Sequence, residues 1–558
     1  MNMRLVTICF LVFAATTIMA QERVKKIEFY GAAKTNILHQ DFNVAGDTLN
    51  LSKANYGHSL IDLGILVRPS ANTEISTEFR LRNELGGFWG GAVTYGIRKL
   101  TLKGVVNDAI RYKIGDIDLE MTPYTLFNNN YQDVVNEATV FKMAREVIDY
   151  ENYFSGNAWR QQGIQSSYGF YLNNETFKSI DVNLFSTRNR TADPSSASPE
   201  RLFSGGQIGL NTSYGLFTFN SANLFDLKNT VNDMNLYYNL VNTISANISL
   251  PEFSKFSLNY ESGISKSNYE NLIEEETETI QDYFWNFGLI YSSNNKIRLS
   301  VNCINTGPQF RSPAAQNIRL GYSSISNVFP TIGNNLAIRN MGLIDYLYND
   351  VFYYKTFDNQ LDLYNPAFSN ALPYGLATPN RKGFSVSLDE LAVKKVLNLS
   401  SEIHMMSEII GTGTTLLKSF MKFVAKANYD YKKWSANLGL AYESTSRDGQ
   451  VYEKIELSSI LFDFGVDFDL TDQLSVIFGT KYHMANGNEL LMVYDSYNNP
   501  LYFDPINYND HKQMLNSIGI MVNFSELSKL TASLSSFSQK AEQEYAFNQI
   551  QILYRLNF

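Results

Sequence analysis

The chain ends with the stretch Tyr554-Arg555-Leu556-Asn557-Phe558, in which apolar side chains occupy every second position. The alternation extends back through Ile552 and Ile550, and polar residues fill the positions between them. Successive side chains of a β-strand point to opposite faces, so this stretch predicts a strand with one apolar face and one polar face. The final residue of that strand is an aromatic one.

This strand resembles the terminal strand of Gram-negative outer-membrane β-barrels. In that family the barrel-assembly machinery reads a closing aromatic residue. The resemblance therefore implies that Phe558, Leu556 and Tyr554 form an assembly signal. It also implies a location in the cell outer membrane. The implied partners are membrane lipid, lipopolysaccharide, the assembly machinery and other outer-membrane or periplasmic proteins.

The first 20 residues are typical of a secretory signal peptide. Arg4 precedes a mostly apolar run from Leu5 to Ala15, and Ala20-Gln21 provides a cleavage point. An apolar run of about 11 residues is too short to cross a bilayer core of about 30 Å as a helix. We therefore expect removal of residues 1–20 and a single barrel domain over residues 21–558.

The composition favours the same class. Aromatic residues make up 14% of the chain, and the mean hydropathy is −0.20. A helical membrane protein is more apolar, whereas a transmembrane barrel alternates lipid-facing and lumen-facing positions and gathers Tyr and Phe at both interfaces. After Ala20, no stretch of 18 consecutive apolar residues occurs in the sequence.

One predicted hairpin shows the alternation most clearly. Apolar residues alternate with polar ones from Ile460 to Leu470, and Thr471-Asp472 then turns the chain into a second alternating run. Pattern alone fits a two-sheet sandwich as well as a barrel. In a barrel the polar face lines the lumen, so this hairpin predicts lumen carboxylates at Asp463, Asp467 and Asp469.

A second hairpin runs from Ser59 to Val67, turns at residues 69–72 and continues to Leu81. Its polar face carries both signs of charge. Such a set is able to create the transverse field of a porin constriction, and the alternative is a paired, solvated lumen wall. The candidate constriction residues are Glu74, Glu78, Arg80 and Arg82.

Similar runs along the chain predict a single transmembrane antiparallel β-barrel of about 22 strands, within a range of about 18 to 22. We expect short turns at the periplasmic end and long extracellular loops. Two long loops, residues 119–161 and 306–381, are expected to fold into the lumen. The expected long connections are residues 38–56, 119–161, 187–202, 266–280, 306–381 and 485–512.

The N-terminal region distinguishes barrels that carry a plug domain from barrels that do not. A TonB-dependent transporter would carry a plug of about a hundred residues before its first strand, whereas strand character begins here at Val24 to Ala33. The sequence therefore predicts a barrel without a plug domain. Its Asn- and Tyr-rich composition, Lys-poor strands and Ala-Gln cleavage site are similar to those of outer-membrane proteins of the Bacteroidota.

Several other classes of function find little support in the sequence. Cys303 is the only cysteine after residue 20, so we expect no internal disulfide. The five histidines lack the spacing of metal ligands, and the net charge of −9 argues against nucleic-acid partners. We expect no enzyme activity, catalytic residue, metal or cofactor, and we interpret His404 and His483 as histidines of the water-facing rim.

Three functional hypotheses follow from these patterns. The favoured one is a porin-like channel that passes small or oligomeric solutes passively through a charged lumen. The alternative is a non-conducting accessory barrel of an outer-membrane secretion or protein-assembly complex. The third hypothesis is an enzyme centred on His404 or His483, and no spacing around either histidine supports it.

Overall fold

A computed structural model of the chain describes residues 26–44, 52–84, 93–129, 136–151, 156–195, 198–228, 235–249, 255–273, 275–293, 297–316, 357, 359–361, 364–393, 396–495, 499–541 and 544–558. The predicted signal peptide lies outside these ranges, as do parts of the two long segments that were expected to enter the lumen.

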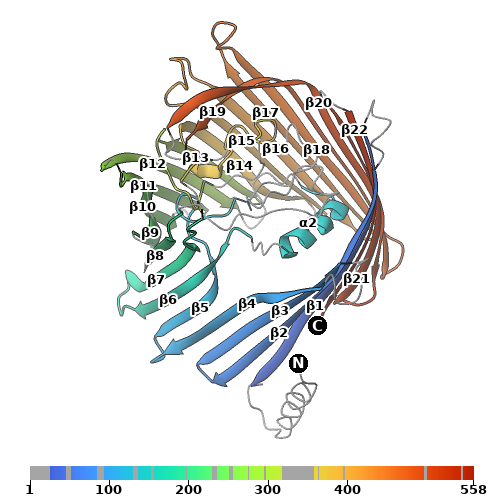
Figure 1. The fold of residues 1–558 in the computed structure, drawn as a ribbon, viewed down its shortest axis with the longest axis horizontal. Coiled ribbons are helices and arrows are strands. Elements are labelled where there is room, and N and C mark those ends of the chain that lie inside the picture. The colour runs from blue at the N-terminus through green and yellow to red at the C-terminus, as the bar shows by residue number, and fades with distance from the viewer. Residues whose placement is uncertain are drawn as a thin grey trace.

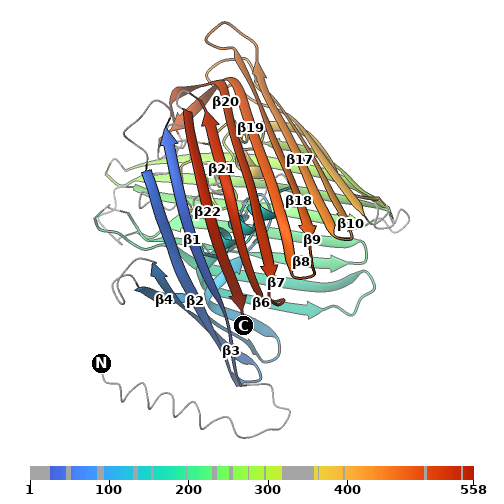
Figure 2. The ribbon, with the colours of Figure 1, turned by 90° about the vertical axis from the view of Figure 1, so that its right-hand side faces the viewer.

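The described residues form one sheet of 22 strands (Figures 1 and 2). In chain order the strands are β1 (Ile27–Val44), β2 (Ser52–Ser70), β3 (Thr73–Glu84), β4 (Val93–Val106), β5 (Ile110–Leu119), β6 (Trp159–Tyr171), β7 (Phe177–Arg190), β8 (Arg201–Thr212), β9 (Gly215–Asp226), β10 (Asn235–Ser249), β11 (Phe256–Asn271), β12 (Glu276–Ser293), β13 (Ile297–Thr306), β14 (Arg381–Val393), β15 (Leu397–Ser407), β16 (Ser419–Tyr431), β17 (Trp434–Arg447), β18 (Ile455–Asp469), β19 (Leu474–Tyr494), β20 (Pro500–Asn523), β21 (Ser528–Lys540) and β22 (Glu544–Asn557).

The sheet closes on itself. Each strand pairs antiparallel with its sequence neighbours, and β1 also pairs with β22, from Ala32 opposite Asn557 to Val44 opposite Tyr545. A closed ring leaves no strand edge unpaired, which is a requirement for a sheet that meets hydrocarbon. The predicted antiparallel barrel and its strand number are therefore confirmed.

The two faces of each strand differ as the alternation predicts. On β20 and β21, the side chains of Ile518, Ile520 and Leu534 are about half exposed on the outer surface. Leu515 and Phe537, at positions of opposite parity, are buried inside the ring. Because an apolar side chain gains little from facing water, an outer surface of this kind suits a hydrocarbon solvent.

Two short turns occur where the sequence predicts them: residues 71–72 join β2 to β3, and residues 470–473 join β18 to β19. Residues 432–433 form a third short turn, between β16 and β17. These turns lie at the same end of the barrel as the C-terminus (Figure 2). No helix among the described residues combines the length and the apolar character needed to cross a bilayer.

Three of the predicted long connections are wrong because the strands continue into them. Between β1 and β2 only residues 45–51 separate the strands, between β11 and β12 only residues 272–275, and between β19 and β20 only residues 495–499. Backbone hydrogen bonds pair these extensions, and side-chain contacts such as the one between His39 and Asn55 at 2.7 Å add to them. The extensions do not keep a regular outward-facing apolar row once the strands have passed the apolar belt, so their sequences looked like loops.

Candidate functional site in the lumen

A helix lies inside the ring of strands (Figure 1). This helix, α2 (Thr139–Glu151), is part of the long segment between β5 and β6. Its apolar side chains pack on the inner face of the barrel wall. The contacting residues are Ala138, Val140, Phe141 and Met143 on the helix side and Ile477, Leu515 and Phe537 on the wall.

The barrel wall presents a glycine, Gly479, where the helix begins. A Cβ atom on Gly479 of β19 would lie 2.7 Å from the Cβ of Ala138 and 2.8 Å from a methyl carbon of Val140. Such distances are shorter than ordinary contacts between carbon atoms, so the close approach of α2 requires glycine at this position.

Lumen carboxylates hold the first turn of the helix. The backbone N–H of Ala138 donates to Asp463 at 3.3 Å, and the hydroxyl of Thr139 donates to Asp467 at 2.5 Å. The ammonium of Lys481 lies 3.1 Å from Asp463 and balances its charge. Carboxylates at a helix N-terminus satisfy unpaired N–H groups and interact favourably with the helix dipole.

The third predicted lumen carboxylate belongs to a different environment. Asp469 accepts a hydrogen bond of 2.6 Å from Ser475 across the turn between β18 and β19. The hairpin therefore brings two of its three aspartates to α2 and keeps the third at the turn.

The other end of α2 reaches the wall formed by β1, β2 and β4. The hydroxyl of Tyr150 donates to Asp62 of β2 at 2.5 Å. The Nζ of Lys34 lies 3.2 Å from the centre of the Tyr150 ring, and the guanidinium carbon of Arg98 lies 3.9 Å from it. Arg98 also donates to the backbone carbonyl of Tyr150 at 3.0 Å. Two cations on one electron-rich ring form a strong contact in a site shielded from water.

Burial raises the pKa of the Tyr150 phenol above its usual value, and the hydrogen bond to Asp62 raises the pKa further. The phenol therefore stays protonated at neutral pH, and it donates to the carboxylate.

Two of the predicted constriction residues belong to this contact. Arg80 forms a two-pronged ion pair with Asp62, with both N···O distances at 2.9 Å. Glu78 accepts hydrogen bonds from Arg98 at 3.2 Å and from Tyr30 at 3.1 Å. Paired planar groups of this kind fix geometry as well as charge.

The other two predicted constriction residues lie apart from the helix. Glu74 pairs with Lys103 at 2.6 Å and with Arg68 at 3.2 Å near the turn between β2 and β3. Arg82 pairs with Glu84 at 2.6 Å, and both side chains are well exposed. The four residues therefore divide into two that belong to the contact with α2, Glu78 and Arg80, and two that do not, Glu74 and Arg82.

The two long segments also pack against each other. The side-chain amide of Asn129 donates to the backbone carbonyls of Ala315, at 2.7 Å, and Tyr374, at 3.2 Å. Tyr124 stacks on Phe284 of β12 with 3.8 Å between ring centres. Residues 120–129, 307–316 and 364–380 thus form one body against the inner wall, which we name the lumen body.

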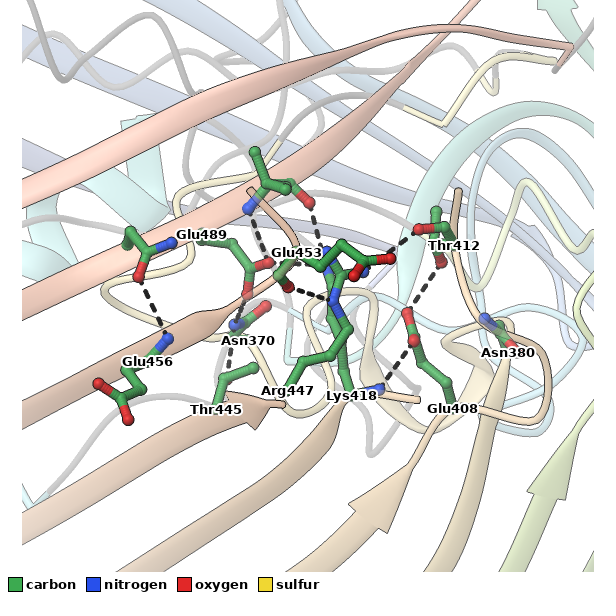
Figure 3. A network of polar contacts seen from close by, with 12 residues as sticks. Asn370, Asn380, Glu408, Thr412, Lys418, Thr445, Arg447, Glu453, Glu456 and Glu489 are labelled. Atoms are coloured by element: carbon green, nitrogen blue, oxygen red, sulfur yellow. Dashed lines mark hydrogen bonds and ion pairs between the residues drawn. The ribbon is translucent and has the colours of Figure 1, made fainter. Parts of the chain in front are cut away.

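A polar network ties the lumen body to strands β16–β19 (Figure 3). The side chain of Asn370 donates to Glu489 at 2.6 Å and to Thr445 at 2.7 Å, and its backbone N–H donates to Glu443 at 2.8 Å. Lys418 lies 2.6 Å from Glu489, which is fully buried. A buried carboxylate is stable only with such partners, so the network fixes the position of Asn370.

The expected location of two histidines is wrong. His483 is only 1% exposed and His404 only 6%, so neither side chain lies at a water-facing rim. The lumen body covers both, and Phe368 stacks on His483 with 4.1 Å between ring centres. Sequence alternation identified the strand faces of these residues but contains no information on what covers them.

Sequence reasoning also missed the residues that hold α2 at its second end. Asp62, Arg98 and Lys34 are marked in the sequence only by their positions on the polar faces of their strands. Among the described residues, no group of three or more His, Cys, Asp or Glu side chains has an arrangement that could hold a metal ion.

Comparisons with known proteins give no family. No family model and no curated protein sequence matches the chain. Solved structures similar to this chain include OpdQ from Pseudomonas aeruginosa, which is 10% identical, with 96% of this chain and 99% of that chain covered and a TM-score of 0.35. The FrpB iron transporter from Neisseria meningitidis is 8% identical, with 95% and 82% covered and a TM-score of 0.44. The copper transporter OprC is 8% identical, with 95% and 81% covered and a TM-score of 0.46. The fold assignment rests on the strand pairing and not on these resemblances.

Proposed function

We propose that this protein is a passive channel of the outer membrane for small solutes, and that α2 narrows its lumen. The observation that carries the proposal is the position of α2. The helix lies inside a closed barrel and contacts charged wall residues at both ends, with Asp463 and Asp467 at one end and Asp62 and Arg98 at the other.

The outer surface supports a membrane location. It carries many large apolar side chains that are exposed to solvent in the isolated chain, and they lie on all sides of the barrel. Burying such a surface in acyl chains gains about 25 cal/mol for each Å² removed from water. The closed ring of backbone hydrogen bonds meets the second requirement for a membrane-spanning sheet.

The wall charges determine which solutes this channel would favour. Near α2 every acidic group named above has a cationic or hydrogen-bonding partner, so the local field is weaker than the number of charges implies. The whole chain carries a net charge of −9. We therefore propose a weak preference for cations and neutral solutes over anions.

Electrical recording on planar bilayers tests this function. A conducting barrel gives steady unitary currents, and its reversal potential in a salt gradient reports the cation preference. The alternative of an accessory barrel predicts a silent membrane and a partner protein that co-purifies in a fixed ratio. A protein that inserts, passes no current and holds such a partner would contradict the channel proposal.

A further inference from the structure

A closed-in slot lies between the lumen body and the inner wall of β15–β19. Its volume is about 190 Å³. Four apolar side chains of the lumen body form the roof, and strand residues form the floor. The roof residues are Ala367, Phe368, Leu372 and Leu376.

The roof is held in place by contacts at its edges. Asn370 is fixed by its side-chain hydrogen bonds to Glu489 and Thr445 (Figure 3). Its backbone N–H also donates to Glu443. The guanidinium of Arg381 donates to the backbone carbonyl of Ala371 at 2.9 Å, and Tyr508 donates to Asn365 at 2.6 Å. The slot is therefore part of the folded barrel and does not depend on a ligand to form.

The floor combines a polar row and an apolar row. His404, Lys422, Glu443 and Ser459 are successive cross-strand partners, and they form the polar row. Val424, Ala441 and Leu461 are partners in the next row, which is apolar between Glu402 and His483 at its two ends. A ligand in this slot would meet hydrogen-bonding groups on one side and hydrocarbon on the other.

Two buried nitrogen atoms at the slot, the Nδ1 atoms of His404 and His483, have no hydrogen-bond partner. The Nε2 of His483 lies 2.9 Å from the carbonyl oxygen of Ala367, and the Nε2 of His404 lies 2.8 Å from Glu402. Both oxygens are hydrogen-bond acceptors, so each Nε2 carries the proton of its ring. In a neutral imidazole the other nitrogen, Nδ1, is then an acceptor. Neither Nδ1 atom has a partner, and both rings line the slot. An unsatisfied buried acceptor is costly and calls for a donor.

The charges of the slot cancel. Its lining contains the carboxylates of Glu402 and Glu443 and the ammonium groups of Lys422 and Lys426. Lys422 lies 2.8 Å from Glu443. A site with equal numbers of both charges, already paired in part, offers no excess charge to an ionic ligand.

From these features we propose that the slot binds a small uncharged polyol, a class that includes sugars and sugar alcohols. Hydroxyl groups donate to free acceptors such as the two Nδ1 atoms and also accept from ammonium groups. The carbon faces of a polyol suit the apolar roof and the apolar row of the floor. The volume equals that of about six water molecules, which the hydroxyls would replace.

The slot has a way in from the lumen. The side chain of Glu402 is 46% exposed, whereas His483 is almost fully buried at the opposite end. A solute in the lumen would therefore enter beside Glu402. The slot is then a resting position along the wall of the barrel, and its occupancy does not depend on whether the barrel conducts.

Titration calorimetry on the full barrel in detergent tests the proposal, with D-mannitol and D-glucose as uncharged probes. D-gluconate and D-glucosamine serve as anionic and cationic probes of the same size. We expect saturable binding of at least one uncharged probe and binding at least about tenfold weaker for both charged ones. The method needs no membrane, so its result is separate from the conductance test.

Two variants test whether the uncharged probes bind in the slot. Ala441→Leu fills the middle of the floor, and His404→Leu removes one acceptor; each should weaken binding about tenfold or more. Ala436→Leu, on the outer face of the same strand, is the matched control and should bind as the wild type does. No saturable binding of either uncharged probe would overturn the proposal. Equal binding of the charged probes, or unchanged binding in both slot variants, would also overturn it.

Discussion

Gly31 and Phe558 exchange both of their backbone hydrogen bonds and so complete the seam of the barrel. The N–H of Gly31 donates to the carbonyl of Phe558 at 2.7 Å, and the N–H of Phe558 donates back at 3.0 Å. The C-terminal residue is thereby part of the ladder between β1 and β22. The ring of Phe558 covers Gly31, because a Cβ atom on Gly31 would lie 2.7 Å from the Cζ of Phe558.

Gly31→Ala should weaken the seam. The new Cβ would lie 2.3 Å from the carbonyl oxygen of Asp62 and would also displace the Phe558 ring. Such overpacking costs about 1–3 kcal/mol of the free energy of unfolding. Gly96→Ala is the matched control, since a Cβ there meets nothing within 4 Å. Denaturant unfolding in detergent measures both, and equal stabilities would contradict the account of the seam.

Phe558→Ala should reduce the amount of protein that reaches the outer membrane. The terminal aromatic is the residue that the sequence resemblance assigns to the assembly signal. Phe524→Ala is the control, because Phe524 is similarly exposed at the same end of the barrel but lies at an internal turn. Quantifying both variants in outer-membrane fractions checks the prediction, which fails if the two accumulate equally.

Phe464→Arg should destabilise the barrel from its outer face. Phe464 neighbours Asp463 on β18 and therefore points away from the lumen. A cation on the lipid face costs about 2–4 kcal/mol near the midplane of the bilayer. Phe464→Leu keeps the face apolar and should cost far less. Folding measurements in lipid vesicles compare the two, and an arginine variant as stable as the leucine variant would place this face away from lipid.

Tyr150→Phe should change the response of stability to alkaline pH. The pKa of Tyr150 is higher in the folded state than its ordinary value of 10.0, so its contribution is complete below about pH 10. The contribution is lost as the pH rises through the folded value. At pH 8 the variant should be less stable than the wild type by about 1 kcal/mol, because Asp62 loses a donor. Above pH 10 the difference should narrow. Unfolding curves at pH 8 and 11 test this, and a constant difference would contradict it.

The fold could be predicted from the sequence because the signals that specify a barrel strand lie in neighbouring residues. Alternation along β18, the turn at residues 470–473 and the terminal aromatic each follow from neighbouring residues. The ends of the strands were harder to predict from the sequence. The ends of β19 and β20 mix polar residues with apolar ones such as Leu491 and Ile506, which pack against the lumen body, so regular alternation does not separate a paired strand from a loop there.

Only part of the site could be predicted from the sequence, because its contacts join residues that are far apart in the chain. Glu78 and Arg80 were identified from the polar face of their strand, yet their partners Arg98 and Asp62 depend on the register between strands. The contact of Tyr150 with Asp62 joins residues that are 88 positions apart. No periodic pattern reports such a contact, and the same holds for the roof over His404 and His483.

The unitary conductance of Tyr150→Ala tests most directly whether α2 narrows a conducting lumen. The variant removes both the hydroxyl bonded to Asp62 and the ring that Lys34 and Arg98 contact. Tyr171→Ala, at a residue that is 93% exposed, is the control. We expect steady currents from the wild type, the same currents from the control, and a larger unitary conductance from Tyr150→Ala. Equal conductance in all three proteins, or no current from any of them, would contradict the account.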